Sequence, residues 1–464
     1  MSPPRVRFAP SPTGYLHLGS ARTALFNWLW ARHVGAEMLL RIEDTDRERS
    51  QPELIQVIFD ALEWLGIDFD GEPTFQSDGA IRHSEVVEQL LEAGHAYRCT
   101  CTQDEVAERN KAAGGPPGYD GRCRDRGVGV GVAAGEAHVV RFRVPDGGST
   151  GWDDLIRGPI SFEHRNLEDF VLRRRDGSPM FIVANSVDDA DSSITHVIRG
   201  EDLINVTPKM LLVRAALGVS EPIEFAHLPL IVNEQRKKLS KRKDDASIES
   251  YRERGFLAEA MVNYLALLGW GPPDGVEVRP VAEIIGLFDI VDVNPSPAMF
   301  DIKKLESVNA EYLRAMSVEE FIGVANDRVA TLPGFDPERF AAIAAELQTR
   351  VKTVHDVPAM IGFLFATPET DPVAWDKAIA QNDAAASLLD GAIVAYGTVE
   401  WDRDALHSAT EALAEDHGLK LGKAQAPIRV AVTGRTVGPP LFESLVIMDR
   451  AEVLTRLRAA RDRI

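Results

Sequence analysis

Two short polar segments have the residue types needed to hold the phosphates of a nucleotide. The first is His17-Leu18-Gly19-Ser20, at the end of a loop that leads into a helical pattern. The N-terminus of a helix offers free N–H groups and partial positive charge to a phosphate, and glycine lets the backbone approach closely. The second is Lys238-Leu239-Ser240-Lys241-Arg242, whose lysines suit a pyrophosphate that gains charge as it leaves.

Neither segment is specific when taken alone. A loop glycine beside an incidental histidine explains the first, and a solvated basic loop explains the second. Their combination is more informative, because one opens the first half of a predicted α/β domain and the other closes the second half, roughly 220 residues later. Together they favour an ATP site.

Three cysteines form a second candidate site. Cys99, Cys101 and Cys123 are the only cysteines of the chain and fall within 25 residues. An odd number of cysteines is a poor disulfide framework. Thiolates suit zinc, and a structural zinc ion takes four ligands. The cysteines therefore predict a partial metal site.

The elements that must position the first segment begin as a doubly wound α/β domain. The pattern predicts a strand at 6–8, a helix with Ser20 as its N-cap, a strand at 38–42 and a helix at 52–65. Strand, loop, helix, strand and helix in this order open a Rossmann-type nucleotide domain.

The composition changes near Cys99, and strand signals fade after residue 258. Helical patterns follow at 258–268, 278–288, 318–330, 337–348, 357–365, 375–397, 403–416 and 449–461. We therefore expect an α/β, doubly wound Rossmann-type domain with an inserted α+β domain, followed by all-α C-terminal domains. The predicted divisions are 1–96 with 186–245 for the nucleotide domain, 97–185 for the insertion, 246–318 for a helical junction and 319–464 for a final helical domain.

The overall composition is that of a globular protein. The 464 residues are 45% hydrophobic and 26% charged, and no run of about 18 apolar residues predicts a membrane span. The N-terminus lacks the apolar core of a signal peptide, so we expect a cytoplasmic protein. The net charge of −20 argues against a nucleic-acid partner only weakly, because local patches decide binding and basic clusters occur at 173–175, 236–243 and 450–463.

The two polar segments resemble the paired HIGH and KMSKS signatures of class I aminoacyl-tRNA synthetases. The wider pattern resembles the bacterial type of one family in that class, the glutamyl-tRNA synthetases, and covers essentially the whole chain. The resembling segments are Arg7 to Ser20, Arg41-Ile42-Glu43-Asp44-Thr45-Asp46, Trp64-Leu65-Gly66, Tyr119-Asp120-Gly121-Arg122-Cys123, Val187-Asp188-Asp189, His196 to Asp202, Phe300-Asp301 with Lys304-Leu305, Asn309 with Tyr312-Leu313-Arg314, and Gly418 to Gly434.

This resemblance implies a glutamate–tRNA ligase. Such an enzyme activates glutamate with ATP, as its Mg²⁺ complex, and transfers it to the 3′-terminal adenosine of tRNA(Glu), with tRNA needed for the first step. By resemblance His17, Gly19, Lys238, Ser240 and Lys241 serve catalysis, and His17, Gly19, Ser20, Lys238 and Lys241 bind ATP. The partners are tRNA(Glu), glutamate and ATP, with no membrane, and the state is monomeric.

The resemblance also implies a glutamate pocket. It assigns the two carboxylates to Arg7, Asn185 and Arg199, and the ammonium to Glu43, with Ser11 and Phe181 also in the pocket. Arginine pairs well with carboxylates, but the sequence leaves open which arginine takes which carboxylate. An ion pair of Glu43 with Arg41 or Arg47 is the alternative role of that acid. The family usually has tyrosine where this chain has Phe181.

Two further expectations rest on the resemblance. Some family members have a zinc knuckle in an acceptor-stem-binding insertion, with histidine two residues after the last cysteine. Here that position is Asp125, and Tyr119 is the alternative fourth ligand. Arg350 falls about where discriminating members of the family read the third anticodon base, in the anticodon-binding domain, although a plain surface arginine explains it nearly as well.

Competing functions differ in features that the chain shows. A relaxed enzyme that also charges tRNA(Gln) stays open, and Arg350 argues mildly against it. A shortened relative that modifies a tRNA base would lack the helical chain beyond residue 320, and a glutaminyl enzyme would have a β-barrel there. A catalytically inactive tRNA-binding paralogue is disfavoured by the intact residues of the two polar segments.

Overall fold

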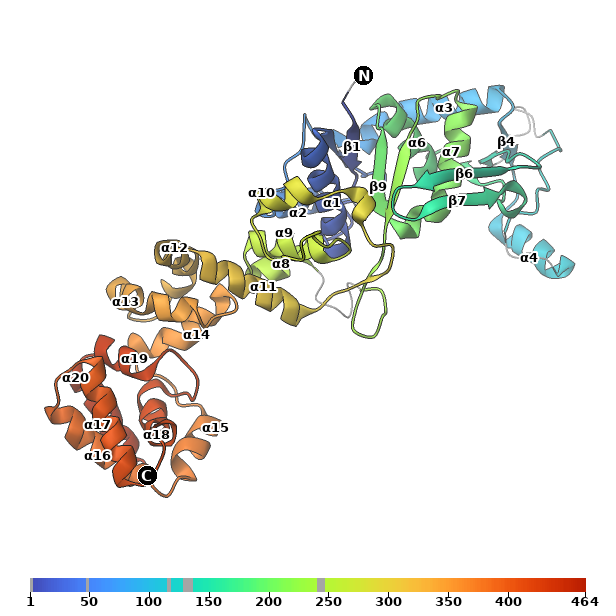
Figure 1. The fold of residues 1–464 in the computed structure, drawn as a ribbon. Coiled ribbons are helices and arrows are strands. Elements are labelled where there is room, and N and C mark those ends of the chain that lie inside the picture. The colour runs from blue at the N-terminus through green and yellow to red at the C-terminus, as the bar shows by residue number, and fades with distance from the viewer. Residues whose placement is uncertain (1–2, 47–49, 115–117, 128–136, 240–246) are drawn as a thin grey trace. The chain divides into compact units, whose positions relative to one another are not determined.

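The computed structural model describes residues 3–46, 50–114, 118–127, 137–239 and 247–464. The chain forms two compact units, one of residues 1–250 with 261–301 and the other of residues 251–260 with 302–464 (Figure 1). The expected junction at 246–318 is thus distributed over both units. The finer division into four parts stays a prediction.

Parallel strands form the centre of the first unit. Strand β1 (Arg5–Phe8) pairs with β2 (Glu37–Ile42), and β2 pairs with β3 (Thr74–Phe75). Strand β9 (His196–Gly200) pairs with β10 (Glu224–Leu228). The N–H of Thr195 donates to the carbonyl of Arg5 at 3.0 Å, so β9 starts beside β1.

The resulting strand order β3, β2, β1, β9, β10 is that of a doubly wound sheet. From β1 the strands are added toward one edge, and from β9 they are added toward the other edge. The fold class predicted from the sequence is confirmed. Its helices are α1 (Leu18–Val34), α2 (Pro52–Trp64), α3 (Ala80–Glu92), α6 (Phe181–Asp191) and α7 (Thr207–Ala216).

Helix α1 begins earlier than expected. Its N-cap is His17 and not Ser20: the backbone of His17 is extended, and its Nδ1 accepts the N–H of Ser20 at 3.1 Å. A cap needs only a side-chain acceptor that can reach a free N–H group. Histidine is not among the usual cap residues, so the pattern favoured the serine.

The expected insertion contains two kinds of sheet. Strands β4 (Ala96–Cys99), β5 (Val139–Phe142) and β8 (Val171–Arg173) form a small antiparallel sheet, with α4 (Gln103–Ala113) following β4. The hairpin of β6 (Ser149–Asp154) and β7 (Gly158–Glu163) instead extends the nucleotide-domain sheet, because β6 pairs with β10. The hairpin thereby reaches the strands that carry the candidate site.

The rest of the chain is largely helical. The first unit also contains β11 (Ile231–Val232), β12 (Ala298–Met299) and α10 (Val281–Leu287). The helices α8 (Ile248–Glu253) and α9 (Ala258–Leu267) have residues in both units. The second unit continues with α11 (Ile302–Ala315), α12 (Val318–Val329), α13 (Pro337–Gln348), α14 (Val357–Ile361), α15 (Pro372–Trp375), α16 (Ala385–Thr398), α17 (Arg403–Asp416), α18 (Leu421–Thr433), α19 (Leu441–Ile447) and α20 (Arg450–Asp462).

One predicted helix, 375–397, is interrupted in the structure. Helix α16 begins only at Ala385, and Asn382 lies in the break. The Asn382 side chain donates to the carbonyl of Ala378 and accepts the N–H of Ala384, so it satisfies backbone groups that a continuous helix would pair. Among the described helices, none is both long and apolar enough to cross a membrane.

Candidate active site

A cavity of about 620 Å³ lies at the carboxyl ends of β1, β9 and β10. This is where doubly wound sheets bind their ligands, and its volume suits a small molecule. Every described residue that the sequence predicted for the ATP and glutamate sites lines it: Arg7, Ser11, His17, Gly19, Ser20, Glu43, Phe181, Asn185, Arg199 and Lys238. Ser240 and Lys241 lie outside the described residues.

Gly19 is required by the geometry of the N-cap. A Cβ atom at this position would lie 3.1 Å from the imidazole of His17, which is tighter than ordinary side-chain contact. The glycine therefore lets the imidazole fold over the first turn of α1 and reach Ser20. The same turn lines the cavity, where the helix N-terminus favours an anion.

Lys238 reaches the cavity from a tight turn after β11. The Asn233 side chain accepts the N–H of Lys237 at 3.0 Å, and Arg236 has the left-handed φ of 57° that the turn needs. The ammonium group of Lys238 lies 3.0 Å from Asp202, in a pair whose two side chains are more than half exposed. Such a pair is weakly held, so Lys238 can exchange Asp202 for a phosphate.

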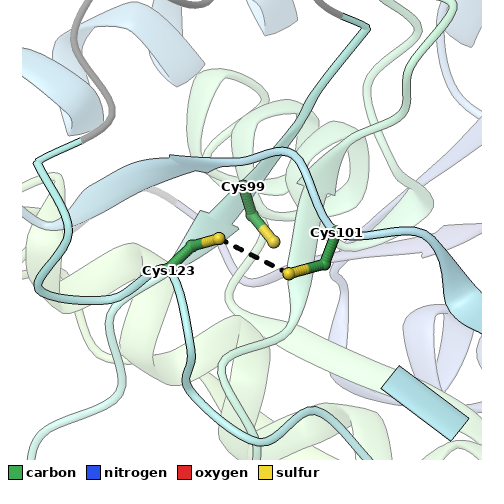
Figure 2. A group of neighbouring side chains, drawn as sticks. All are labelled: Cys99, Cys101 and Cys123. Atoms are coloured by element: carbon green, nitrogen blue, oxygen red, sulfur yellow. Dashed lines mark hydrogen bonds between the residues drawn. The ribbon is translucent and has the colours of Figure 1, made fainter. Parts of the chain in front are cut away.

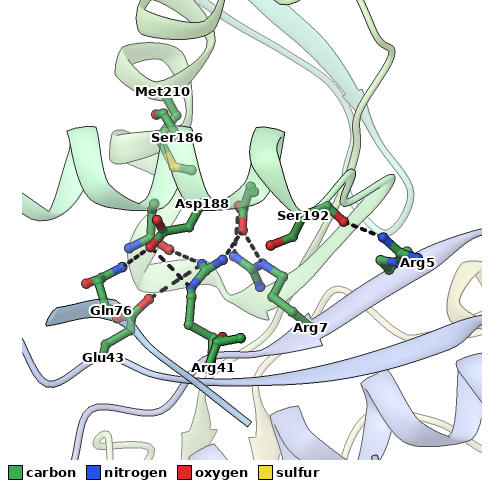
Figure 3. A network of polar contacts seen from close by, with 12 residues as sticks. Arg5, Arg7, Arg41, Glu43, Gln76, Ser186, Asp188, Ser192 and Met210 are labelled. Atoms are coloured by element: carbon green, nitrogen blue, oxygen red, sulfur yellow. Dashed lines mark hydrogen bonds and ion pairs between the residues drawn. The ribbon is translucent and has the colours of Figure 1, made fainter. Parts of the chain in front are cut away.

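Arg7 is held by a buried carboxylate. Its Nε donates to Asp189 at 3.1 Å, and Nη1 of Arg41 donates to the same carboxylate at 2.7 Å. Figure 3 shows the side chains of Arg7 and Arg41 extending from neighbouring strands toward α6. Burial raises the pKa of Asp189, but the two arginines outweigh it and lower that pKa to about 2. Asp189 therefore stays ionised.

Glu43 and Asn185 are oriented by Arg41. The guanidinium group of Arg41 donates to the amide oxygen of Asn185 at 2.7 Å and lies 3.8 Å from the Glu43 carboxylate. The ion pair of Glu43 with Arg41, which the sequence offered as the alternative role of this acid, is thus present, and Arg47 lies outside the described residues. Burial raises the pKa of Glu43, although Arg41, Arg7 and Asn185 oppose the shift. The amide nitrogen of Asn185 donates to the carbonyl of Phe181 at 3.4 Å and is hydrogen-bonded to the Glu43 carboxylate.

Arg199 differs from Arg7 in its surroundings. Its nearest partners are neutral: Nη2 donates to the Thr207 hydroxyl at 2.7 Å, and Nε lies 3.3 Å from Nε2 of His227. No carboxylate among the residues that the structure describes lies within ion-pair distance of Arg199. Burial and the charge of Arg7 lower the pKa of Arg199 to about 10. The guanidinium group is still protonated at neutral pH, so it is a buried cation with no carboxylate of the described residues in direct contact, although Asp189, Glu43 and Asp154 act on it from farther away.

The three cysteines come together in the inserted region (Figure 2). Their sulfur atoms lie within 4.8 Å of one another, and those of Cys101 and Cys123 are 3.5 Å apart. Sulfurs around a tetrahedral zinc ion are about 3.8 Å apart, from a zinc–sulfur bond of about 2.3 Å. The sulfur atoms are therefore spaced as three ligands of a zinc ion would be.

The two candidate fourth ligands are placed differently. The Tyr119 hydroxyl accepts the N–H of Cys123 at 2.7 Å and lies 3.4 Å from the sulfur of Cys99. Asp125 does not join the group, because its largely exposed carboxylate pairs with Arg143 at 3.0 Å. Tyr119 thus lies at the cysteine cluster, whereas Asp125 lies away from it.

Arg350 belongs to the second unit and is exposed just after α13. Its side chain is about half exposed, at 46%, and lies 3.9 Å from Glu346. This loose pair leaves the guanidinium group accessible to a partner. Its role stays a prediction.

Sequence reasoning missed the residues that hold the cavity arginines. Asp189 appeared only within the resembling segment Val187-Asp188-Asp189, and His227 and Asp154 were not singled out. Arg7 and Arg41 fall in predicted strands of a doubly wound sheet, where a buried arginine needs an acid, but the strand pattern does not say which acid. For Asp154 and His227 only the pairing of β6 with β10 reveals the contact.

Comparison with known proteins agrees over the whole chain. A family model described as "tRNA synthetases class I (E and Q), catalytic domain" matches residues 4–307, and one described as "Anticodon binding domain" matches residues 283–461. A glutamate–tRNA ligase of Frankia alni is 50% identical over 471 residues, which cover 99% of this chain and 98% of the relative. One of Salinispora arenicola is 49% identical and covers 99% of both chains.

Solved structures give the same result. The crystal structure of a glutamate tRNA ligase from Elizabethkingia meningosepticum, in complex with its amino acid, matches with a TM-score of 0.86 and 32% identity over 99% of each chain. A second structure, from Elizabethkingia anophelis, matches with a TM-score of 0.85 and 31% identity.

Proposed function

The chain belongs to the glutamate–tRNA ligases, a family of class I aminoacyl-tRNA synthetases, and from this premise we propose that the described cavity activates glutamate with ATP for transfer to tRNA(Glu). The observation that carries the proposal is the joint lining of one cavity. It combines a helix N-terminus and Lys238, suited to phosphates, with Arg7, Arg199 and Glu43, suited to a dicarboxylic amino acid.

The reaction follows from these groups without a protein nucleophile. An oxygen of the glutamate α-carboxylate attacks the α-phosphorus of ATP, the bond to the bridging oxygen breaks, and pyrophosphate leaves with the electron pair. A hydroxyl of the terminal adenosine of tRNA then attacks the carbonyl carbon, loses its proton, and displaces AMP. The residues supply position and charge stabilisation. Mg²⁺ bound with ATP would supply further positive charge for the pyrophosphate, beside Lys238.

Each cavity residue has a role in this proposal. Arg7, Asn185 and Arg199 bind the carboxylates, and Glu43 accepts the ammonium group. His17, Gly19, Ser20 and Lys238 hold ATP, with Ser240 and Lys241 from the same lysine segment, while Ser11 and Phe181 border the glutamate. The chain after the lysine segment supports this arrangement: Ser247 forms a backbone bridge with His17, and the N–H of Ile248 donates to Leu16.

Two measurements test the proposal. Purified protein should charge tRNA(Glu) with radiolabelled glutamate, and ATP–pyrophosphate exchange should need tRNA. Charging of tRNA(Gln) to a similar extent would establish the relaxed alternative, and exchange without tRNA would reject the dependence. A protein that binds tRNA but gives neither activity would be the inactive paralogue.

We expect a cytoplasmic monomer, so sedimentation should give the mass of one chain.

Zinc completes the proposal for the inserted region. We expect Cys99, Cys101 and Cys123 to hold the ion, with the Tyr119 oxygen as fourth ligand in place of Asp125. A structural zinc ion here would join the end of β4 to the segment that contains Tyr119. Metal analysis of protein purified without chelator should give about one zinc per chain, and less than roughly 0.2 would contradict it. Tyr119→Phe should lower zinc retention, whereas Asp125→Asn should not.

A further inference from the structure

Behind Arg199 lies a histidine that the reaction does not use. His227, on β10, is completely buried, and its Nε2 lies 3.3 Å from Nε of Arg199 and 3.0 Å from the Thr207 hydroxyl. Its other ring nitrogen, Nδ1, is hydrogen-bonded to the carboxylate of Asp154. The imidazole therefore stands between an acid and Arg199, whose hydrogen-bond partners are neutral groups.

Asp154 decides which nitrogen carries the proton. Its oxygens accept hydrogen bonds from the backbone N–H groups of Ile156, Arg157 and His227, each at 3.2 Å. Burial raises the pKa of Asp154, but the contacts with His227 outweigh it and lower that pKa. An ionised carboxylate can only accept, so Nδ1 must carry the proton. Nε2 then offers its lone pair to the N–H of Arg199 and to the Thr207 hydroxyl.

The histidine has little freedom to adopt another arrangement. Its ring is stacked on that of Phe225, with the ring centroids 6.0 Å apart and an interplanar angle of 8°. The centroid of the Trp152 ring lies 5.9 Å from that of His227. Burial is the largest cause that lowers the pKa of His227, so the ring is neutral at pH 7. A proton on Nε2 would instead bring two donors face to face, because Arg199 has no acceptor.

We propose that His227, held in one tautomer by Asp154, is a positioning residue that orients Arg199 toward the substrate carboxylate. This inference rests on the proposed function of the cavity. The arrangement places an acid on the far side of a neutral ring, so Arg199 keeps its orientation without direct neutralisation. A carboxylate in direct contact would compete with the substrate for the guanidinium group. Asp154 ends β6, so the hairpin supports Arg199 from behind the cavity, through His227.

Two substitutions of the same residue separate its two hydrogen bonds. The shorter amide of His227→Asn can still donate to Asp154 but does not reach Arg199. The longer amide of His227→Gln puts an oxygen near the position of Nε2 and keeps the acceptor. Asp154→Asn leaves the ring in place but offers Nδ1 a donor, which moves the proton to Nε2.

We expect a pattern in the Michaelis constants. A hydrogen bond to a charged group is worth about tenfold or more in binding, so His227→Asn and Asp154→Asn should raise the KM for glutamate by at least about tenfold. The KM for ATP should stay within about twofold, and His227→Gln should recover most of the glutamate affinity. The double variant His227→Asn with Asp154→Asn should be no worse than either alone, because both break the same contact.

A matched control comes from the same hairpin. His164 is also buried, and its ring binds Thr150 and the Gly147 carbonyl, both at 2.8 Å and away from the cavity. His164→Gln should leave the glutamate KM unchanged. Equal losses in this control, equal increases in both KM values, or unchanged kinetics in His227→Asn would overturn the inference.

The wild-type protein provides a test that does not depend on a variant folding. With ¹⁵N-labelled histidine, the nitrogen shifts of His227 at pH 7 should show a protonated Nδ1 and an unprotonated Nε2. The opposite tautomer, or an imidazolium, contradicts the inference. Wild-type protein that charges no tRNA with glutamate would reject the proposed function itself, whereas an active wild type with unaffected variants rejects only the role of His227.

Discussion

Arg7 and Arg199 have opposite electrostatic surroundings in one cavity. Asp189 neutralises Arg7 directly, whereas the nearest partners of Arg199 are neutral. A buried charge without a counter-ion is costly to the folded protein. Arg199 is therefore the stronger candidate for a substrate carboxylate, because glutamate would supply the missing anion. The sequence alone could not distinguish the two arginines, since it does not show which of them has a buried acid as its neighbour.

This contrast predicts opposite effects on stability. Arg199→Met removes an uncompensated charge, so the melting temperature without glutamate should be unchanged or higher, while the glutamate KM rises by at least about 100-fold from two lost charged hydrogen bonds. Arg7→Met leaves Asp189 with one arginine fewer and should destabilise the fold by about 1–3 kcal/mol. Thermal denaturation and charging kinetics measure both. A lower melting temperature in Arg199→Met than in Arg7→Met contradicts this argument.

Glu43 predicts how glutamate affinity depends on pH. Its carboxylate must be ionised to accept the substrate ammonium, and burial raises its pKa above the ordinary 4.5. Protonation as the pH falls through this raised pKa removes the acceptor, so the glutamate KM should rise toward acid pH. In the absence of glutamate, the pH dependence of folding stability has the opposite sign. The ionised form of Glu43 is the one that burial disfavours, so its contribution to the free energy of unfolding decreases as the pH rises.

Glu43→Gln isolates this effect. The variant should have a higher glutamate KM at every pH and should lose the acid dependence, because its side chain does not titrate. Charging assays between pH 5 and pH 8 at saturating ATP and tRNA provide the measurement. If the variant keeps the acid dependence of the wild type, another group is responsible.

Phe181 predicts a gain of affinity. It starts α6 and lines the cavity, where the family usually has tyrosine. A restored hydroxyl that contacts glutamate would add about 0.5–1.5 kcal/mol, or up to about tenfold in affinity. Phe181→Tyr should therefore lower the glutamate KM, with Phe181→Leu as a control for loss of the ring. Unchanged kinetics in Phe181→Tyr would contradict this prediction.

At the scale of elements, the start of α1 sets the ATP side of the cavity. Gly19→Ala would place a Cβ atom 3.1 Å from the His17 imidazole, so the ring must move by a few tenths of an ångström. Displacement of a positioning group lowers catalysis strongly, and we expect kcat/KM for ATP to fall by about tenfold or more. Gly286→Ala in α10 is the control, because its Cβ would meet nothing within 4 Å. Similar losses in both variants would contradict the role of the cap.

Several elements with periodic patterns were predicted, whereas the helices α3 and α11 were not. Helix α2 begins at Pro52 as expected, since proline suits the first helical position. The cap at His17 and the break at Asn382 rest on hydrogen bonds of single side chains, which periodicity does not register. The pairing of β6 with β10 joins distant residues, so local patterns carry no signal for it.

At the scale of the whole molecule, the net charge of −20 did not identify the partner. Charge on separate surfaces acts locally because salt screens it over about 10 Å. The family resemblance predicted a tRNA ligase despite the acidic composition, and the comparisons confirmed it. What the sequence could not supply is the set of contacts behind the cavity, where Asp189 meets Arg7 and Arg41 and Asp154 meets His227, residues that lie far apart in the chain.

Arg350 provides the prediction that concerns the choice of tRNA. Its accessible guanidinium group in the second unit suits an anticodon base, and loss of one base contact costs about 1–3 kcal/mol. Arg350→Ala should therefore raise the KM for tRNA(Glu) by at least about fivefold, leave the glutamate KM unchanged, and narrow the preference over tRNA(Gln). The exposed Arg403, paired with Glu443 at 2.8 Å, is the control for loss of surface charge. If the Arg350→Ala variant only shows a weaker salt dependence of tRNA binding, with equal loss for both tRNAs, the arginine contacts phosphate and does not read a base.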